Sequence, residues 1–360
     1  MTNTSNPQPQ FHDALVVADK QGASEVHYAV GSSPIMRLAD NFVPIDGFPA
    51  LTPEQAEEIT ASFLSQSEQE YLRARREITG AYTFPNGLRC RYHVFFQKGY
   101  PSFSIHLLPQ NLPTIESLRL PKIVETLSKL PHGLVAVTGP YGSGRSSTIA
   151  ALLNSINQTR AARILTLESP IEFIFDSAKS LVEQREVGRD AESYEAALRQ
   201  ILGEDVDVVM VAEVTSANVA SLLMELASSR LVLAMFDDPT SVKVIEHILS
   251  LFPAAEEAII RSTLADVLGG VVVQRILSRA QGGRTMICEI LLGTPSIKTI
   301  IRDGKLIQLV NIIQTSRAEG LISLDQALAE AVRANEISAD DAQREAVDPH
   351  YLQSLFKRGA

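Results

Sequence analysis

A glycine-rich turn between two apolar patterns is the feature that most constrains the fold. The run Gly133–Thr138 has the length and composition of a buried strand, and a helical pattern extends from the turn to about Asn157. The turn reads GPYGSGRS, one position away from the phosphate-binding pattern GxxxxGK[ST], because Arg145 stands where the pattern has lysine. Glycines let the backbone curl so that its N–H groups point at a phosphate, and the helix adds its positive end.

The turn therefore predicts a nucleotide site, although an ordinary glycine-rich strand-to-helix turn is the simpler alternative. Ser146 stands where the pattern places the hydroxyl that holds Mg²⁺. Lysine would place a compact charge between phosphates, whereas Arg145 carries a broad planar fork on a longer stem. We expect ATP or ADP binding with weak or absent hydrolysis. The expected nucleotide-binding residues are Gly139, Pro140, Tyr141, Gly142, Ser143, Gly144, Arg145, Ser146 and Ser147.

Strands and helices alternate downstream of the turn. Near-continuous apolar strands separated by helices predict an α/β domain with a parallel sheet covered on both faces. A glycine pair at Gly282-Gly283 predicts a hairpin after that alternation. The predicted strands are Arg163–Leu167, Asp207–Ala212, Leu231–Phe236, Val271–Leu277 and Thr285–Leu292, and the predicted helices are Glu192–Leu202 and Ala217–Ser228.

The chain before the turn predicts a smaller α/β domain. Prolines at 109, 113 and 121 mark a linker, so we expect a flexible tail at 1–10, an N-terminal domain at 11–112, a domain with the glycine-rich turn at 113–316 and C-terminal helices at 317–360. The C-terminal helices are expected to pack on the core or on a neighbour. In the N-terminal domain the predicted helices are Phe11–Gln21 and Pro53–Gln66, and the predicted strands are Glu25–Val30, Pro34–Leu38, Leu88–Phe96 and Ser102–Leu108.

Charge and composition exclude several classes of protein. The chain has 32 Lys and Arg against 42 Asp and Glu, a net charge of −10, which disfavours general nucleic-acid binding. The two cysteines, Cys90 and Cys288, lie far apart, which excludes a disulfide framework and a cysteine zinc site. The N-terminus has no apolar stretch, and no apolar run approaches the roughly 20 residues that span a bilayer. We expect a cytoplasmic protein with no direct membrane insertion.

Two glutamates end predicted strands downstream of the turn. Glu213 follows Asp207–Ala212, and Glu168 follows Arg163–Leu167. Acidic residues are common at strand ends for solubility alone, but in phosphate-loop enzymes such a carboxylate lies near Mg²⁺ and the attacking water. We therefore expect both glutamates to be catalytic, and Glu213 also to hold Mg²⁺, directly or through water.

An arginine pair stands out in the N-terminal domain. Arg89 and Arg91 flank Cys90 on a predicted strand, so their side chains share one face of the sheet. Two interpretations remain open: a solvated sheet face, or a pair of guanidinium groups that reaches a phosphate in a neighbouring domain or subunit. We keep both arginines as candidate catalytic residues.

Six segments together resemble the PilT family of type IV pilus retraction (twitching motility) ATPases, within the secretion ATPase superfamily. The likeness runs from about Lys20 to Arg344. Ile164–Phe173 (ILTLESPIEF) resembles the family's Asp box, and Gly293–Arg302 resembles its GTPAIRNLIRE segment. The other segments are Lys20–His27, the Walker A region Gly133–Ser147, Gln184–Val187 and the Walker B region Glu204–Glu213.

The resemblance implies a PAS-like N-terminal domain, a RecA-like P-loop ATPase domain and a hexameric ring, with nucleotide between the domains. It also implies that Glu213 is the Walker B glutamate, that Glu168 is the first acidic residue of the Asp box, and that Arg89 and Arg91 reach the phosphates. The implied partners are other copies of the chain or an active PilT-type paralogue, and the inner-membrane platform protein of the pilus.

The chain departs from the family pattern at several positions. Besides Arg145, Ser169 replaces the second acidic residue of the Asp box, and Arg230 and Asp237 replace both histidines of the His box. Ala212, Thr215 and His106 are further departures. We interpret these as losses clustered at catalytic positions. The favoured hypothesis is a pseudo-ATPase or very slow ATPase that acts as a regulatory or accessory subunit of a pilus retraction motor. The alternatives are an active retraction motor and a related secretion-system ATPase.

Overall fold

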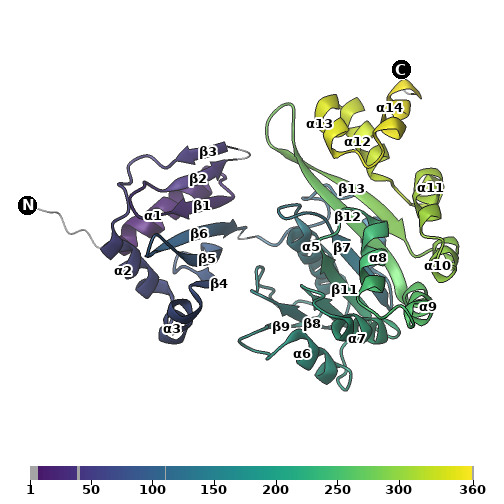
Figure 1. Cartoon of the computed structure of the whole chain (residues 1–360), viewed down its shortest axis with the longest axis horizontal. Helices are drawn as coiled ribbons and strands as arrows, with labels where there is room; N and C mark the ends of the chain where they lie inside the picture. Colours follow the sequence, from purple (N-terminus) through teal and green to yellow (C-terminus); the bar gives the residue numbers. More distant parts are fainter. Residues whose placement is uncertain (1–6, 39–40, 110, 359–360) are drawn as a thin grey trace, which may run out of the picture. The chain divides into compact units, whose positions relative to one another are not determined.

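The computed structural model describes residues 7–38, 41–109 and 111–358, which form two compact units (Figure 1). The N-terminal unit extends to Asn111 and includes the short segment Pro170–Phe173. The C-terminal unit holds the remainder. The sequence analysis had placed the boundary after residue 112 and had assigned residues 170–173 to the ATPase domain. Helix α1 begins at Pro7, inside the expected tail, whose first six residues lie outside the described part of the chain.

The N-terminal unit is an antiparallel sheet with helices on one face. Six strands lie in the order β3-β2-β1-β6-β5-β4. Along β5, buried residues alternate with half-buried ones, and the buried set packs with α1 and α2 in one hydrophobic core. The strands are β1 (Glu25–Tyr28), β2 (Ile35–Leu38), β3 (Asn41–Pro44), β4 (Glu77–Thr83), β5 (Arg89–Gln97) and β6 (Tyr100–Leu108), and the helices are α1 (Pro7–Lys20), α2 (Pro53–Phe63) and α3 (Gln66–Arg75).

The single helix predicted over Pro53–Gln66 is wrong in its second half. Helix α2 ends at Phe63 because Leu64 is extended. Ser65 then starts α3 with a capping box, in which its side chain accepts from the Glu68 amide while the Glu68 carboxylate accepts from the Ser65 amide. The sequence analysis also missed β3, β4 and, in the C-terminal unit, β9.

The C-terminal unit contains the predicted parallel sheet. Its seven strands lie in the order β13-β12-β7-β11-β10-β8-β9, and only β13 runs antiparallel to its neighbour. The predicted hairpin joins β12 to β13 through Gly282 and Gly283, both at positive φ. The strands are β7 (Gly133–Thr138), β8 (Arg163–Glu168), β9 (Leu181–Glu186), β10 (Val208–Val211), β11 (Leu231–Phe236), β12 (Leu268–Ser278) and β13 (Arg284–Leu292).

Helices cover both faces of this sheet, as a doubly buried parallel sheet requires. All six residues of β7 are buried. Leu134 and Ala136 share a core with helices α6 to α11, whereas α5 packs on β7 and β11 with a separate set of buried side chains. The helices are α4 (Val124–Ser128), α5 (Arg145–Thr159), α6 (Tyr194–Ile201), α7 (Ala217–Ala227), α8 (Ser241–Ser250), α9 (Glu257–Val267), α10 (Pro295–Arg302) and α11 (Ile307–Thr315).

The last three helices form a small cluster on β13. They are α12 (Leu324–Arg333), α13 (Ala339–Glu345) and α14 (Pro349–Arg358). Leu324 and Leu328 are fully buried there against Ile287 of β13, so these helices pack on the body of the unit.

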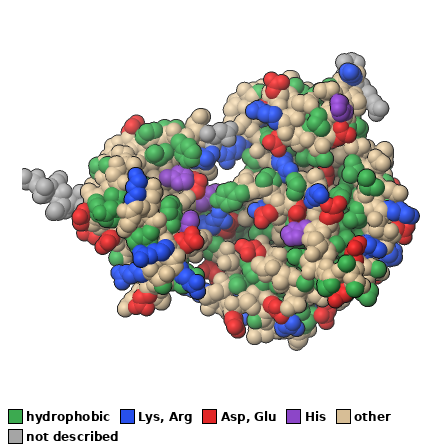
Figure 2. All heavy atoms as spheres, viewed as in Figure 1, with side chains coloured by type: hydrophobic (Ala, Val, Ile, Leu, Met, Phe, Trp, Pro, Cys, Tyr) green, Lys and Arg blue, Asp and Glu red, His purple; other side chains and the backbone are tan. Residues whose placement is uncertain are grey.

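Charged side chains of both signs lie on the surface of the C-terminal unit. On the face shown in Figure 2, acidic and basic side chains are interspersed over the C-terminal unit. Among the residues that the structure describes, none of the helices combines the length and the apolar character needed to cross a bilayer.

Candidate nucleotide-binding site

The glycine-rich turn forms a tight loop between a buried strand and a helix. Strand β7 ends at Thr138, the loop occupies residues 139–144, and α5 begins at Arg145. Gly139, Gly142 and Gly144 all have positive φ, so the loop bends where only glycine bends without strain. The predicted order of strand, loop and helix is confirmed, and the first amides of α5 are directed toward the loop, as in phosphate sites.

Gly139 is also required sterically. A Cβ at this position would lie 2.4 Å from the Gln274 carbonyl oxygen and 2.6 Å from Ser143 Oγ, whereas a Cβ at Gly142 would meet open space. We expect Gly139→Ala to lower the free energy of unfolding by about 2–3 kcal/mol through clash and strain. The matched control Gly142→Ala should cost about 1 kcal/mol, from positive φ alone. Urea unfolding followed by far-ultraviolet circular dichroism would check this, and equal losses would contradict it.

The loop carries donors that fit a phosphate. Ser143 is buried, and its Oγ has no hydrogen-bond partner among the described residues. Ser146 lies half-buried in the first turn of α5, next to Ser147. A hydroxyl at this place can ligate Mg²⁺ beside a phosphate, and the buried hydroxyl of Ser143 can donate to a phosphate oxygen. The donor set therefore fits a nucleotide with its Mg²⁺.

Arg145 points to the neighbouring strand. Its Nη1 donates to the Phe236 carbonyl oxygen at 2.5 Å and also contacts the Asp237 carboxylate in an ion pair. The Arg145 side chain is 18% exposed, whereas that of Asp237 is 83% exposed. The guanidinium is thus paired inside the chain.

The register of the sheet explains why these groups meet. Phe236 of β11 pairs with Thr138 of β7, so both strands end at the same level of the sheet. The loops that follow them therefore lie side by side. At the same end of the sheet, Val211 of β10 pairs with Leu167 of β8. Glu168 is the last residue of β8, and Glu213 lies two residues beyond the end of the adjacent strand β10. Parallel pairing therefore gathers the phosphate loop, both glutamates and Asp237 at the carboxyl end of the sheet, where open α/β sheets bind ligands.

The two glutamates differ in environment. Glu168 is buried. Its carboxylate accepts hydrogen bonds from Thr166 Oγ1 at 2.6 Å and from Gln184 Nε2 at 3.2 Å. Glu213 is exposed. Burial, together with the charges of Glu213 and Glu168, raises the pKa of Tyr194. The exposed carboxylate of Glu213 is suited to hold a water or Mg²⁺, whereas Glu168 is held by Thr166 and Gln184.

The arginine pair lies on the outer face of β5 in the N-terminal unit. Arg89 donates through Nε to the Glu172 carbonyl at 2.9 Å and through Nη2 to the Ile171 carbonyl at 2.5 Å. Arg91 Nη1 lies 2.9 Å from Glu172 Oε1. Both guanidinium groups hold the segment Pro170–Phe173, which belongs to the same unit. Neither prediction, a solvated sheet face or a pair that reaches a phosphate, fully describes these contacts with residues 170–173.

Most of the chain is similar to proteins of known family. Residues 114–344 match the family model described as type II/IV secretion system protein. The chain is 34% identical to the type IV pilus retractation ATPase PilT of Pseudomonas aeruginosa, over 94% of this chain and 98% of that protein. It is 33% identical to a twitching motility protein of Neisseria gonorrhoeae, over 87% of this chain and 84% of that protein. The chain belongs to the PilT-like family of type IV pilus retraction ATPases.

Solved structures agree. The pilus retraction motor PilT with bound ADP superposes with a TM-score of 0.85 at 32% identity, covering 95% of this chain and 98% of that one. The type IV pilus ATPase PilU of P. aeruginosa is also similar, at 29% identity over 98% of this chain and 92% of that protein. The RecA-like P-loop domain, the PAS-like N-terminal domain and the C-terminal helices are thus confirmed.

One departure from the PilT pattern was wrongly interpreted as catalytic. Arg230 precedes β11, so it lies at the amino end of the sheet, opposite the phosphate loop. There its Nη2 donates to the carbonyls of Leu202 and Glu204 at 3.3 and 2.8 Å. A six-residue strand separates it from Asp237, so the two changes in the His box have different consequences.

Sequence reasoning missed several groups at the site. Gln184 and Thr166 hold Glu168, and the buried Tyr194 hydroxyl has no hydrogen-bond partner among the described residues. The QREV segment containing Gln184 was recognised only as a family likeness. The pairing of Arg145 with Asp237 spans 92 residues and had no local signal.

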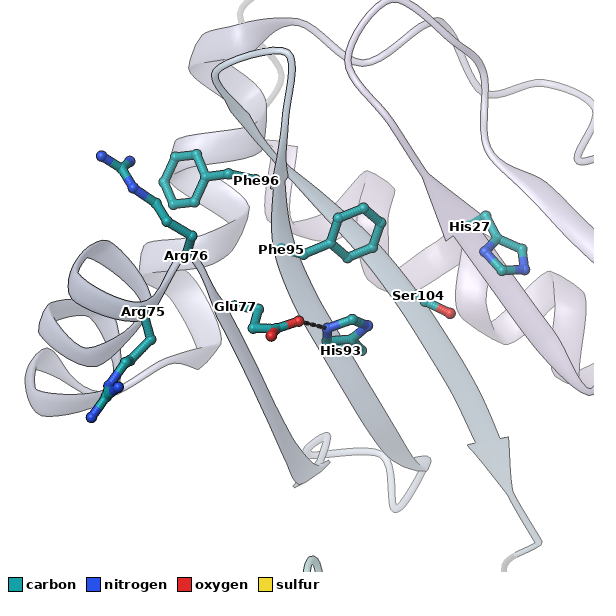
Figure 3. Close-up of a pocket in the computed structure, with 8 residues that line it drawn as sticks. All are labelled: His27, Arg75, Arg76, Glu77, His93, Phe95, Phe96 and Ser104. Carbon is teal, nitrogen blue, oxygen red and sulfur yellow. Dashed lines mark hydrogen bonds and ion pairs between the residues drawn. The ribbon is translucent and has the colours of Figure 1, made fainter. Parts of the chain in front are cut away.

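A separate pocket of about 540 Å³ lies in the N-terminal unit (Figure 3). His93 Nε2 lies 3.1 Å from Glu77 Oε2, and the Arg76 guanidinium lies over the Phe96 ring. None of the expected site residues is among its described lining residues, so its chemistry is distinct from that of the phosphate loop. The lining residues are His27, Arg75, Arg76, Glu77, His93, Phe95, Phe96 and Ser104.

Proposed function

We propose that this PilT-like chain binds ATP or ADP, hydrolyses ATP weakly, and serves as a regulatory subunit of a pilus retraction motor. The observation that carries the proposal is the engagement of Arg145 by Asp237 and the Phe236 carbonyl within an otherwise complete phosphate loop. The loop retains the means to hold phosphate, but its cation is directed to a carboxylate. The loop can therefore still bind nucleotide, but the Arg145 cation is less available at the position where phosphoryl transfer needs a charge.

In this proposal, residues of the site keep distinct tasks. The amides of the loop and of the first turn of α5 bind phosphate oxygens, and the Ser143 hydroxyl donates to them. Ser146 and Glu213 would hold Mg²⁺, which neutralises phosphate charge when bound. Glu168 stays held by its hydrogen bonds from Thr166 and Gln184 and keeps a carboxylate beside the phosphate loop. Arg89 and Arg91 are proposed to act on phosphates only if they release the segment Pro170–Phe173.

The proposed assembly is a hexameric ring, either of this chain alone or mixed with an active PilT-type paralogue. Such a ring would act in the cytoplasm, against the inner-membrane platform protein of the pilus. The similarity to both PilT and PilU supports a place in the retraction machinery. Nothing in this assignment requires nucleic acid or membrane insertion.

An active retraction motor is the second candidate function. It is favoured by the presence of Glu168 and Glu213 at the ends of adjacent strands. In that case Arg145 would have to leave Asp237 during each turnover and serve in place of lysine. A related secretion-system ATPase is a third candidate.

Phosphate release from Mg-ATP tests the proposal. We expect a turnover below about 0.01 s⁻¹, far under the 1–10³ s⁻¹ of typical enzymes, together with measurable nucleotide binding. Glu213→Gln should leave binding in place. A turnover of about 1 s⁻¹ that Glu213→Gln abolishes would establish the active motor instead.

Mass photometry of this chain mixed with a PilT-type ATPase tests the regulatory role. Mixed hexamers would support it. Failure to form any mixed ring, or to bind the platform protein, would count against it.

A further inference from the structure

We propose that Asp237 is an internal competitor for nucleotide phosphate, and so a specificity-determining residue of the phosphate loop. The inference deepens the proposed function and rests on its claim that the loop binds nucleotide. The carboxylate of Asp237 is the anion that Arg145 holds. A phosphate must displace this carboxylate before it can use the same guanidinium.

The position of Asp237 is fixed by the backbone around it. Thr138 Oγ1, at the end of β7, donates to the Asp238 carbonyl at 2.7 Å. Arg275 Nη2 donates to the Pro239 carbonyl at 2.9 Å. These two bonds hold the loop after β11 against the end of β7 and against β12. The Asp237 side chain therefore stands beside Arg145 although 83% of it is exposed.

The neighbouring carboxylate has a different task. Asp238 Oδ2 lies 2.8 Å from His247 Nδ1 on α8, and its side chain is only 18% exposed. The two adjacent aspartates thus have separate partners, one a histidine and the other the arginine of the phosphate loop. Asp238 provides a control that removes the same charge one residue away.

The chemistry of Arg145 makes the competition effective. A guanidinium binds carboxylate and phosphate through the same donors, and both complexes are charge-assisted. Nη1 already donates to the Phe236 carbonyl as well as to Asp237, so the head group is oriented toward β11. A lysine would present a compact point charge on a different stem instead of this planar head group. Arginine at 145 and aspartate at 237 therefore act as a pair.

Binding of Mg-ATP, measured by isothermal titration calorimetry, tests the competition. Asp237→Asn should tighten the dissociation constant about three- to fivefold, the effect of removing one largely exposed charged competitor. In an Arg145→Ala background the same change should alter it less than twofold, since no guanidinium remains to be released. Asp238→Asn should also change it less than twofold.

Equal tightening in both backgrounds, or equal tightening by Asp238→Asn, would overturn the competition in favour of a general charge effect. A second readout works without nucleotide: phenylglyoxal labelling of Arg145, followed by mass spectrometry. Release from Asp237 should speed labelling at least threefold in Asp237→Asn. An unchanged labelling rate would overturn the inference even if ATP binds. Absence of ATP binding in every variant, with faster labelling, would instead overturn the proposed function and the competition that rests on it.

Discussion

Replacing Arg145 by lysine and Asp237 by asparagine in one chain is expected to raise phosphate release from Mg-ATP by about 10- to 100-fold. The first change restores a compact charge that can stand between phosphates, and the second removes the carboxylate that would attract it. One positioned donor in an active site is worth about 10²–10³ in rate, so the gain is set slightly below that range for a site with other departures.

The single variants separate the two contributions. Arg145→Lys alone should gain less than the double variant, because Asp237 would still attract the ammonium group. Phosphate release at saturating Mg-ATP measures all three. Glu213→Gln added to the double variant should return the rate to background, which shows that the new turnover uses this site. Tight ATP binding by the double variant without faster turnover would contradict the prediction and assign the lost rate to positions such as Ser169.

Glu289→Ala is expected to lower the free energy of unfolding by about 3–5 kcal/mol. Glu289 on β13 is 6% exposed and accepts from the Ser241 amide at 2.9 Å and from Ser241 Oγ at 2.5 Å. It also accepts from the backbone of Leu324. Ser241 and Leu324 begin helices α8 and α12, so one carboxylate ties two helix ends to the sheet. Alanine would leave three buried donors unpaired, each costing about 1–3 kcal/mol.

Glu289→Gln is the milder variant, because its amide oxygen still accepts, and it tests the charge. Burial raises the pKa of Glu289 above its ordinary 4.5, and the charge of Asp325 adds to the shift, while the bonds from Ser241 and Leu324 oppose it. The folded chain therefore holds a proton at pH values where the unfolded chain has lost it. The contribution of Glu289 to stability is largest below about pH 4.5 and falls as the pH rises through the folded pKa.

Urea unfolding between about pH 5 and pH 8, followed by circular dichroism, measures both effects. The stability of Glu289→Gln relative to the unchanged chain should improve as the pH rises, because glutamine does not ionise. A constant difference across that range would contradict a raised pKa. A loss of less than about 1 kcal/mol for Glu289→Ala would contradict the tie between the two helices.

Local chemistry made much of the fold predictable. Short local patterns each indicate a single structure. They predict the strand Gly133–Thr138, the bends at the loop glycines and the hairpin at Gly282-Gly283. The break between α2 and α3 was missed although Ser65 and Glu68 carry a capping-box pattern, because helical propensity is continuous across it. Strand β9 was missed because it is half-buried at the sheet edge and lacks an apolar run.

The sequence by itself determined the parallel sheet, the phosphate loop and the placing of Glu168 and Glu213 at strand ends, since each depends on neighbours in the chain. Only the tertiary structure decided which side chains contact one another at those strand ends. The pairing of β11 with β7 brings Asp237 to Arg145 across 92 residues, and the direction of β11 carries Arg230 to the opposite edge. Strand order and register are set by the packing of the whole sheet, so no local pattern contains them.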